Sequence, residues 1–188
     1  MKSSAGRILT THVGSMPRPE SIKALLRARL AGQPVDEAVA DVVRRQARAG
    51  LDIVSDGEMG KTSFLAYADD RLTGFVPIPA GDPGLPSSNA GGSWSRRIDT
   101  RREWRAFRDY YEDYLPRAMP PSAPPTVCQG PISYKGHARL RRELDTFKAA
   151  LRDVDVAEAF VPAIAPAMVG RGQNQYYATE EEYVFAIA

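Results

Sequence analysis

The chain has 188 residues, with 25 lysines and arginines against 23 acidic residues, and 43% of its residues are hydrophobic. This length predicts one globular domain over residues 1–188, and the balanced charge argues against a nucleic-acid partner or a membrane surface. The single cysteine, Cys128, excludes an internal disulfide and favours a reducing compartment such as the cytoplasm, and no apolar run approaches the ~20 residues of a membrane helix.

The chain opens with a predicted strand over residues 7–15, where β-branched and aliphatic residues run into a glycine. His12 and Ser15 then lie at the carboxyl end of that strand. Apolar residues at helical spacing predict a helix over 20–30 and a second helix over 37–49. In the second helix they are Val39, Val42 and Val43, with Asp36 as the N-cap and Gly50 just past the end.

A short buried strand is predicted over 51–55, followed by a turn that carries two carboxylates, Asp56 and Glu58. In parallel α/β proteins the loops that follow the carboxyl ends of strands usually carry the chemistry. Gly57 and Gly60 allow a sharp turn and the close approach of a ligand. The alternative is a polar turn in which Asp56 caps the next helix.

The middle of the chain is less regular. Residues 76–95 are rich in proline, glycine, serine and asparagine and predict a long flexible loop inserted after the second strand. Residues 95–114 predict a polar helical stretch with clustered arginines, which is interpreted as an anion site or, in preference, as a solvated helix face.

The C-terminal part returns to the alternation of strands and helices. The predicted elements are a strand over 125–131, a helix over 137–151, a strand over 157–164, and a last helix that begins with a capping box of Thr179 and Glu182. Ser133 and Tyr134 follow the third strand. Four strands alternating with helices predict an α/β fold with a parallel sheet, and the candidate side chains all follow strand ends, as on the rim of a (βα)8 barrel.

Two stretches resemble the cobalamin-independent methionine synthase family, in particular its short single-barrel members, which include epoxyalkane:coenzyme M transferases. They are residues 9–19 (LTTHVGSMPRP) and residues 50–58 (GLDIVSDGE), the second preceded by Gln46. Residues 71–75, 130–134 and 158–163 fit the same pattern, so the resemblance runs from about residue 8 to the end.

The resemblance implies a TIM barrel in which zinc activates a thiol. It also implies that Ser15 and Glu58 bind the amino-acid part of the thiol substrate, where a carboxylate can face an ammonium group. His12, Asp56 and Tyr134 are further candidates for substrate binding, and no residue is assigned a catalytic role. The alternatives are that Ser15 is a turn residue and that Glu58 pairs with Lys61 or a nearby arginine.

The zinc ligands that the resemblance implies are a His-x-Cys pair with later acidic and cysteine residues. Zinc takes about four ligands, whereas this chain offers one cysteine and two histidines, His12 and His137, without ligand spacing. Cys128 is better interpreted as a small core residue. We therefore expect no metal site in this chain alone.

A (βα)8 barrel needs ~250 residues, so four βα units predict half of a TIM barrel. The open strand faces and edges of such a half would need a second chain, another copy of this chain or a rearranged sheet to cover them. We therefore expect the N-terminal half of a split or truncated barrel enzyme. The alternative is a self-contained open α/β sheet covered by the loop that starts at residue 76.

Three functions remain open from the sequence. The leading one is the substrate-binding half of a zinc-dependent methyltransferase that acts on a thiol such as homocysteine, with a methyl donor such as 5-methyltetrahydropteroyltriglutamate. The second is a thiol alkyl transferase or lyase of the epoxyalkane:coenzyme M type. The third is a non-catalytic, barrel-derived subunit that binds a partner chain.

Overall fold

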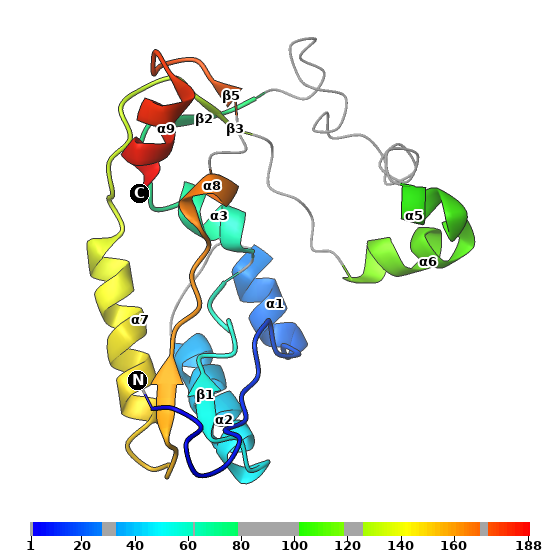
Figure 1. Ribbon diagram of the computed structural model, residues 1–188, viewed down its shortest axis with the longest axis vertical. Helices are drawn as coiled ribbons and strands as arrows, with labels where there is room; N and C mark the ends of the chain where they lie inside the picture. The colour runs from blue at the N-terminus through cyan, green and yellow to red at the C-terminus, as the bar shows by residue number, and fades with distance from the viewer. Residues whose placement is uncertain (1, 28–32, 62, 79–101, 119–125, 170–172) are drawn as a thin grey trace. The chain divides into compact units, whose positions relative to one another are not determined.

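A computed structural model describes residues 2–27, 33–61, 63–78, 102–118, 126–169 and 173–188 (Figure 1). The chain separates into two compact units, which are described one at a time. Unit 1 comprises Met1–Tyr67 and Gly136–Ile164, and unit 2 comprises Ala68–Lys135 and Ala165–Ala188. The prediction of a single domain over residues 1–188 stays a prediction.

The strands of unit 1 are β1 (Ile53–Ser55) and β4 (Glu158–Phe160), which pair in parallel with Ile53 opposite Glu158. The strand predicted over 7–15 is wrong in extent, because in this stretch only Thr11 forms a bridge, which is parallel and faces Ile53. Ile8 and Val13 remain largely exposed there, so hydrophobic burial does little to stabilise a longer strand in this segment.

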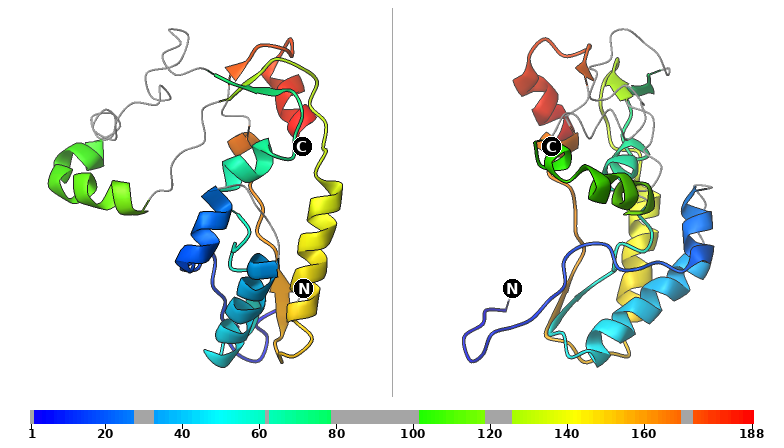
Figure 2. Two further views of the ribbon diagram at one scale, coloured as in Figure 1. Left: turned by 180° about the vertical axis from the view of Figure 1, so that it is seen from behind. Right: turned by 90° about the vertical axis from the view of Figure 1, so that its right-hand side faces the viewer.

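Four helices contribute to unit 1: α1 (Glu20–Arg27), α2 (Gln33–Arg48), α7 (His137–Ala150) and the start of α3 (Phe64–Asp69). The views in Figures 1 and 2 show α2 and α7 alongside the parallel strand pair. The prediction of Asp36 as an N-cap is wrong, because α2 begins earlier, at Gln33, and a proline in the first turn favours that start. Asp36 instead accepts hydrogen bonds from Arg142 of α7 at 3.0 Å and from Thr146 at 3.2 Å. The end of α2 is as predicted, with Gly50 at φ 83° just beyond it.

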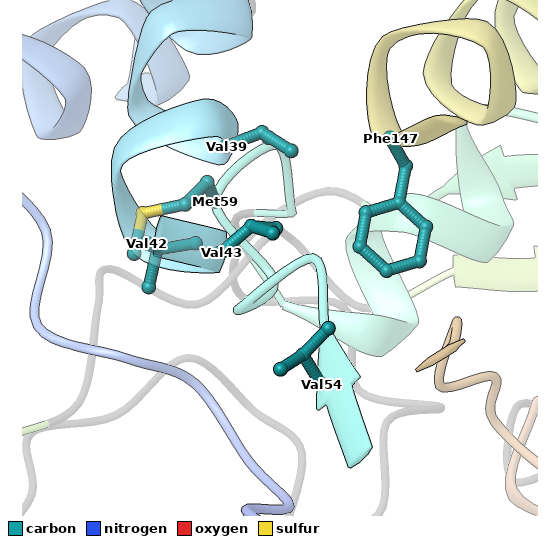
Figure 3. Close-up of a cluster of buried hydrophobic side chains, with 6 residues drawn as sticks. All are labelled: Val39, Val42, Val43, Val54, Met59 and Phe147. Atoms are coloured by element: carbon teal, nitrogen blue, oxygen red, sulfur yellow. The ribbon is translucent and has the colours of Figure 1, made fainter. Parts of the chain in front are cut away.

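The core of unit 1 lies between α2, β1 and α7 (Figure 3). The apolar stripe predicted on α2 is buried as expected, and Phe147 of α7 faces it from the other side. The buried cluster consists of Val39, Val42, Val43, Val54, Met59 and Phe147. Because Val54 directly precedes the turn after β1 and Met59 lies within it, this packing anchors the turn in the core.

The N-terminal segment is tied to the start of β1 through Asp52. The Asp52 carboxylate accepts hydrogen bonds from the Arg7 guanidinium and from the backbone N–H and hydroxyl of Thr10. In return, the backbone N–H groups of Asp52 and Ile53 donate to the carbonyl of Thr10, at 3.1 Å each. These contacts hold the segment that leads to Ser15 beside β1.

Unit 2 has a sheet of its own with the strand order β2 (Phe75–Pro77), β3 (Thr126–Cys128) and β5 (Gln173–Asn174). β2 pairs with β3 antiparallel, and β3 pairs with β5 in parallel. Among the described residues, the helices that lie wholly in unit 2 are α5 (Arg102–Ala106), α6 (Arg108–Ala118), α8 (Pro166–Val169) and α9 (Glu180–Ile187). The predicted Thr179 cap is confirmed, because its hydroxyl accepts from the backbone N–H of Glu182. The other half of the predicted capping box is displaced by one residue, because the Glu182 carboxylate accepts from the backbone N–H of Ala178, the residue before the cap.

Residues 71–75 approach residues 128–135 closely within unit 2. Gly74 has φ 85°, and a Cβ atom there would lie 2.5 Å from the carbonyl oxygen of Gly130, so only glycine fits. Thr73 and Ser133 are joined through backbone and side chains, with 2.8 Å between their hydroxyl oxygens. This contact brings β2 against β3, a pairing that the sequence analysis did not predict.

The prediction of an α/β fold with parallel strands is confirmed, and only a partial barrel is evident. The third predicted strand, now β3, does not extend the β1–β4 sheet but belongs to the sheet of unit 2. Most of the predicted flexible loop, residues 79–95, lies outside the described residues, and Val76 and Pro77 belong to β2. None of the helices in the described ranges is long and apolar enough to cross a membrane.

Candidate functional site

The candidate site is the turn after β1, residues 55–61, together with residues 15–18 of the N-terminal segment. Gly57 and Glu58 both adopt positive φ angles, 62° and 57°. The Ser55 hydroxyl accepts from the backbone N–H of Gly57 at 3.2 Å, and Oδ1 of Asp56 accepts from that of Glu58 at 3.0 Å. The side chains of Ser55 and Asp56 therefore shape the turn locally, as such residues commonly do.

Gln46, in the last turn of α2, attaches the helix to the end of β1. Its buried amide donates from Nε2 to the carbonyl of Ser55 at 2.9 Å, and its Oε1 accepts from the backbone N–H of Ser55 at 3.1 Å. One side chain thus satisfies both backbone groups of the residue before Asp56. The turn is therefore fixed to α2 by a pair of hydrogen bonds as well as by packing.

Ser15 and Glu58 form the centre of the site. The Ser15 hydroxyl donates to Oε2 of Glu58 at 2.5 Å. Glu58 is buried, with 5% of its surface exposed, whereas Ser15 is exposed. No described residue donates to Oε1 of Glu58. The pair therefore presents one available carboxylate oxygen beside a surface hydroxyl.

Arg18 closes the turn from the other side. Its Nη2 donates to the carbonyl oxygens of Glu58 at 2.7 Å and Lys61 at 2.8 Å, and it lies 3.4 Å from the hydroxyl of Ser15. Burial lowers the pKa of the Arg18 guanidinium, and the nearby carboxylates of Glu58 and Asp56 oppose that shift. Arginine nevertheless stays charged in proteins.

Asp56 and Lys61 form a buried ion pair within the turn. Nζ of Lys61, a residue only 3% exposed, donates to Oδ2 of Asp56 at 2.8 Å. The same ammonium lies 5.5 Å from the ring centre of Tyr67 and 6.0 Å from that of Phe64, within the range of cation–π contacts. Both carboxylate oxygens of Asp56 are therefore engaged in holding the turn, so Asp56 supports the site from within.

The structure joins three of the five predicted site residues, Ser15, Asp56 and Glu58. His12 belongs to the same N-terminal segment and is half-buried, and its Nε2 has no hydrogen-bond partner among the described residues. Tyr134 belongs to unit 2, where it bridges Leu72, and is described apart from this site. Of the alternatives for the carboxylates, Lys61 pairs with Asp56 instead of Glu58, and Asp56 accepts from the backbone of its own turn. The nearby arginine, Arg18, donates to the carbonyl of Glu58 and interacts electrostatically with its carboxylate.

Sequence reasoning did not single out Gln46, Arg18 and Lys61 as part of the site. Gln46 and Arg18 both act on backbone atoms, nine residues away for Gln46 and 40 and 43 residues away for Arg18, and no pattern of side chains marks such contacts. The only signals are their positions, in the last turn of a helix for Gln46 and between two prolines for Arg18. Lys61 carries a stronger signal, because a lysine soon after two acidic residues in a turn is a natural ion-pair partner.

The residues of this chain do not fit the zinc site that the resemblance implies. Within the described ranges, no group of three or more histidine, cysteine, aspartate or glutamate side chains could hold a metal ion. Cys128 is buried in β3, and its thiol donates to the carbonyl of Gly130 at 3.5 Å. These donors do not supply the roughly four ligands of a zinc centre.

Residues 8–83 match the family described as Cobalamin-independent synthase, Catalytic domain, and this stretch contains the whole site. Among known proteins, the methionine synthase of Sulfolobus acidocaldarius is 35% identical over 74 residues, covering 35% of this chain and 22% of that protein. The 5-methyltetrahydropteroyltriglutamate–homocysteine methyltransferase of Acidiphilium cryptum is 34% identical over 75 residues, covering 36% of this chain and 10% of that protein. The chain thus matches about a fifth or less of the length of these relatives.

A solved structure of a B12-independent methionine synthase from Shewanella sp. W3-18-1, in complex with selenomethionine, is similar in fold. Its TM-score is 0.52 at 15% sequence identity, and the match covers 94% of this chain and 44% of that one. This similarity concerns the fold alone. Over residues 8–83, which hold the Ser15–Glu58 pair, the sequence of the chain is similar to part of the catalytic domain of cobalamin-independent methionine synthases.

Proposed function

We propose that this chain binds the amino-acid end of a thiol substrate such as homocysteine, as part of a methyltransferase of the methionine synthase type. The observation that carries the proposal is the Ser15–Glu58 hydrogen bond, which lies inside the stretch matched to the catalytic domain. The α-ammonium group of an amino acid would donate to the available Oε1 of Glu58. Such charge-assisted hydrogen bonds are among the strongest in proteins.

The remaining parts of the reaction are proposed to come from outside this chain. These are the zinc ligands, the site for a methyl donor such as a folate, and the strands that complete the barrel. They would belong to a longer protein or a second chain. Another copy of this chain could supply strands but not the zinc ligands, because it has the same single cysteine and two histidines. A cytoplasmic location is part of the same proposal, since the lone cysteine suits a reducing compartment.

Calorimetric titration of the 188-residue chain with L-homocysteine and with 4-mercaptobutanoate tests the proposal. The second compound lacks only the ammonium group. We expect it to bind at least about tenfold more weakly, because a hydrogen bond between charged groups contributes roughly 1.5–3 kcal/mol. Glu58→Gln should remove this difference, while Glu112→Gln, at an exposed ion pair on α6, should keep it. Equal affinities for the two compounds in the wild-type chain would contradict the proposal.

A second candidate is a barrel-derived subunit without catalysis of its own, which the absence of a metal-ligand cluster in the described residues favours. Zinc content and methyl transfer should be measured for the chain alone and for the chain with any co-purifying protein. Zinc and activity that appear only with the second protein would support the methyltransferase. No metal and no thiol binding in either sample would support the subunit, and binding of 2-mercaptoethanesulfonate in preference to homocysteine would favour the coenzyme M type.

A further inference from the structure

Glu58 has an unusual backbone for its residue type. Among the described residues it is the only non-glycine residue with a positive φ, 57°. The left-handed conformation is unfavourable for an ordinary L-residue. Such strain persists only where surrounding contacts fix the conformation. The contacts around Glu58 therefore show what determines the direction of its carboxylate.

Three contacts from residues 15–18 reach this turn, and each has a different target. Ser15 donates to the carboxylate of Glu58, and the backbone N–H of Met16 donates to the carbonyl of Gly57 at 3.1 Å. Arg18 donates from one nitrogen to the carbonyls of Glu58 and Lys61, three residues apart, and the Glu58 carbonyl also accepts from the backbone N–H of Lys61 at 3.0 Å. Among the contacts from residues 15–18, that of Arg18 is thus the one that joins two points of the turn.

Arg18 contacts the peptide group of Glu58 and leaves its carboxylate alone. The hydrogen bond to that carboxylate comes from Ser15, and no described residue donates to Oε1. A guanidinium paired directly with the carboxylate would have occupied the oxygen that a ligand needs. The observed arrangement keeps a positive charge near Glu58 without using up its acceptors.

We infer that Arg18 is a positioning residue for Glu58. By bridging the Glu58 and Lys61 carbonyls, it holds Glu58 in the left-handed conformation and so directs Oε1 toward a ligand ammonium group. The role in ligand selection rests on the proposed function, whereas the role in holding the backbone does not.

The backbone role is tested by a double-mutant cycle on the full chain with Arg18→Ala and Glu58→Gly. Glycine adopts positive φ without strain, so the loss of Arg18 should lower the urea midpoint of unfolding less in the Glu58→Gly background than in the wild-type background. Arg142→Ala, which removes an exposed ion pair with Asp36, should lower it equally in both. Equal effects of Arg18→Ala in the two backgrounds would overturn the inference.

The ligand role is tested by titrating three thiols that differ in one group each. They are L-homocysteine, 3-aminopropane-1-thiol, which lacks the carboxylate, and 4-mercaptobutanoate, which lacks the ammonium group. Arg18→Ala should weaken the binding of the two amines by about tenfold, corresponding to 1.4 kcal/mol, and leave the affinity for 4-mercaptobutanoate unchanged. In a Glu58→Gln background it should have no further effect, and Arg18→Lys, which keeps a donor and the charge, should recover part of the loss.

The two experiments separate this inference from the proposed function. If Arg18→Ala weakens the binding of homocysteine and 4-mercaptobutanoate, which both carry a carboxylate, but not that of 3-aminopropane-1-thiol, Arg18 binds the ligand carboxylate directly. That result would overturn the positioning role. If the wild-type chain binds none of the three thiols, the proposed function fails and the stability cycle alone decides whether Arg18 holds Glu58. Binding of homocysteine that is unaffected by Arg18→Ala would leave the proposed function standing and refute the inference.

Discussion

The hydroxyl of Ser15 is hydrogen-bonded to the carboxylate of Glu58, although the two residues are 43 positions apart in the chain. The exposed serine belongs to an N-terminal segment with little regular structure, and the buried glutamate belongs to a tight turn. Their contact depends on Asp52, which fastens the N-terminal segment to β1, and on Gln46, which fastens the turn to α2. Each of these supports can be tested separately.

Replacing Ser15 by alanine removes the donor to Oε2 of Glu58 without changing the turn. We expect Ser15→Ala to weaken the binding of L-homocysteine by about fivefold, because a typical hydrogen bond contributes about 1 kcal/mol. The control is Ser21→Ala, which changes an exposed serine on α1 and should leave the affinity as it is. Calorimetry gives both dissociation constants, and an unchanged value for Ser15→Ala would remove Ser15 from the binding site.

The turn should tolerate a methyl group at Gly60 but not at Gly57. A Cβ at residue 57 would lie 2.9 Å from Cγ1 of Val42, in a backbone with φ 62°. Gly57→Ala should therefore lower the free energy of unfolding by about 2 kcal/mol or more. At Gly60 the nearest atom is Cγ1 of Val35 at 3.6 Å, an ordinary contact, so Gly60→Ala should have little effect. Urea denaturation measures both, and similar losses for the two variants would show that the left-handed turn is wrongly placed.

Gln46→Met keeps the length of the side chain and removes its hydrogen bonds. The backbone N–H and C=O of Ser55 would then lack the partners they have in the buried strand end. We expect the free energy of unfolding to fall by about 2 kcal/mol, since each buried polar group without a partner costs roughly 1–3 kcal/mol. Gln129→Met, at an exposed position, is the matched control and should change stability little. Denaturation curves that coincide for both variants would argue against the role of Gln46.

Acid should weaken the attachment of the N-terminal segment through Asp52. The hydrogen bond from Arg7, together with that from the Thr10 backbone, holds the pKa of the Asp52 carboxyl well below its usual value of 3.8. A lowered folded-state pKa gives stability that is present above the unfolded value and is lost as the pH falls through the folded one. Asp52→Asn should therefore flatten the stability curve below about pH 4. Asp41→Asn, at an exposed pair on α2, should not, and parallel curves for wild type and Asp52→Asn would contradict the assignment.

Alkali should destabilise unit 2 through Tyr183. This side chain is fully buried, and burial raises its pKa from 10.0 to about 12. The folded state therefore disfavours the phenolate, which forms more readily in the unfolded chain. The free energy of unfolding should be unaffected by Tyr183 below pH 10 and should fall as the pH rises from 10 toward 12. Because the Tyr183 hydroxyl has no hydrogen-bond partner among the described residues, Tyr183→Phe should fold normally and lose this pH dependence. Tyr176→Phe, at an exposed ring, should keep it, and unfolding midpoints measured at pH values between these limits distinguish the two.

Local sequence patterns predicted the features that local interactions determine. The valine stripe of α2, the glycine after its end and the Thr179 cap of α9 follow from spacing and capping chemistry, and all three are present. The carboxylate turn after β1 was predicted from its glycines and its place behind a buried strand. That the stretch also resembles a known catalytic domain is confirmed by the match over residues 8–83.

Contacts between distant segments were not predictable in the same way. The pairing of β2 with β3 depends on the close approach of Gly74 to the Gly130 carbonyl, which a one-dimensional pattern does not encode. The N-terminal strand was expected from β-branched residues, but Ile8 and Val13 remain exposed and only Thr11 of this segment pairs, with Ile53. Arg18 was missed because its partners are backbone carbonyls, which every residue possesses.

The core drawn in Figure 3 has a consequence for the order of events during synthesis. Val43 and Val54 leave the ribosome early, whereas Phe147, which covers them, follows after the whole of residues 68–135 has been translated. Unit 1 therefore cannot complete its core until Phe147 has been synthesised, and the apolar face of α2 stays uncovered until then. Nascent chains arrested before Phe147 should be the species most in need of chaperones.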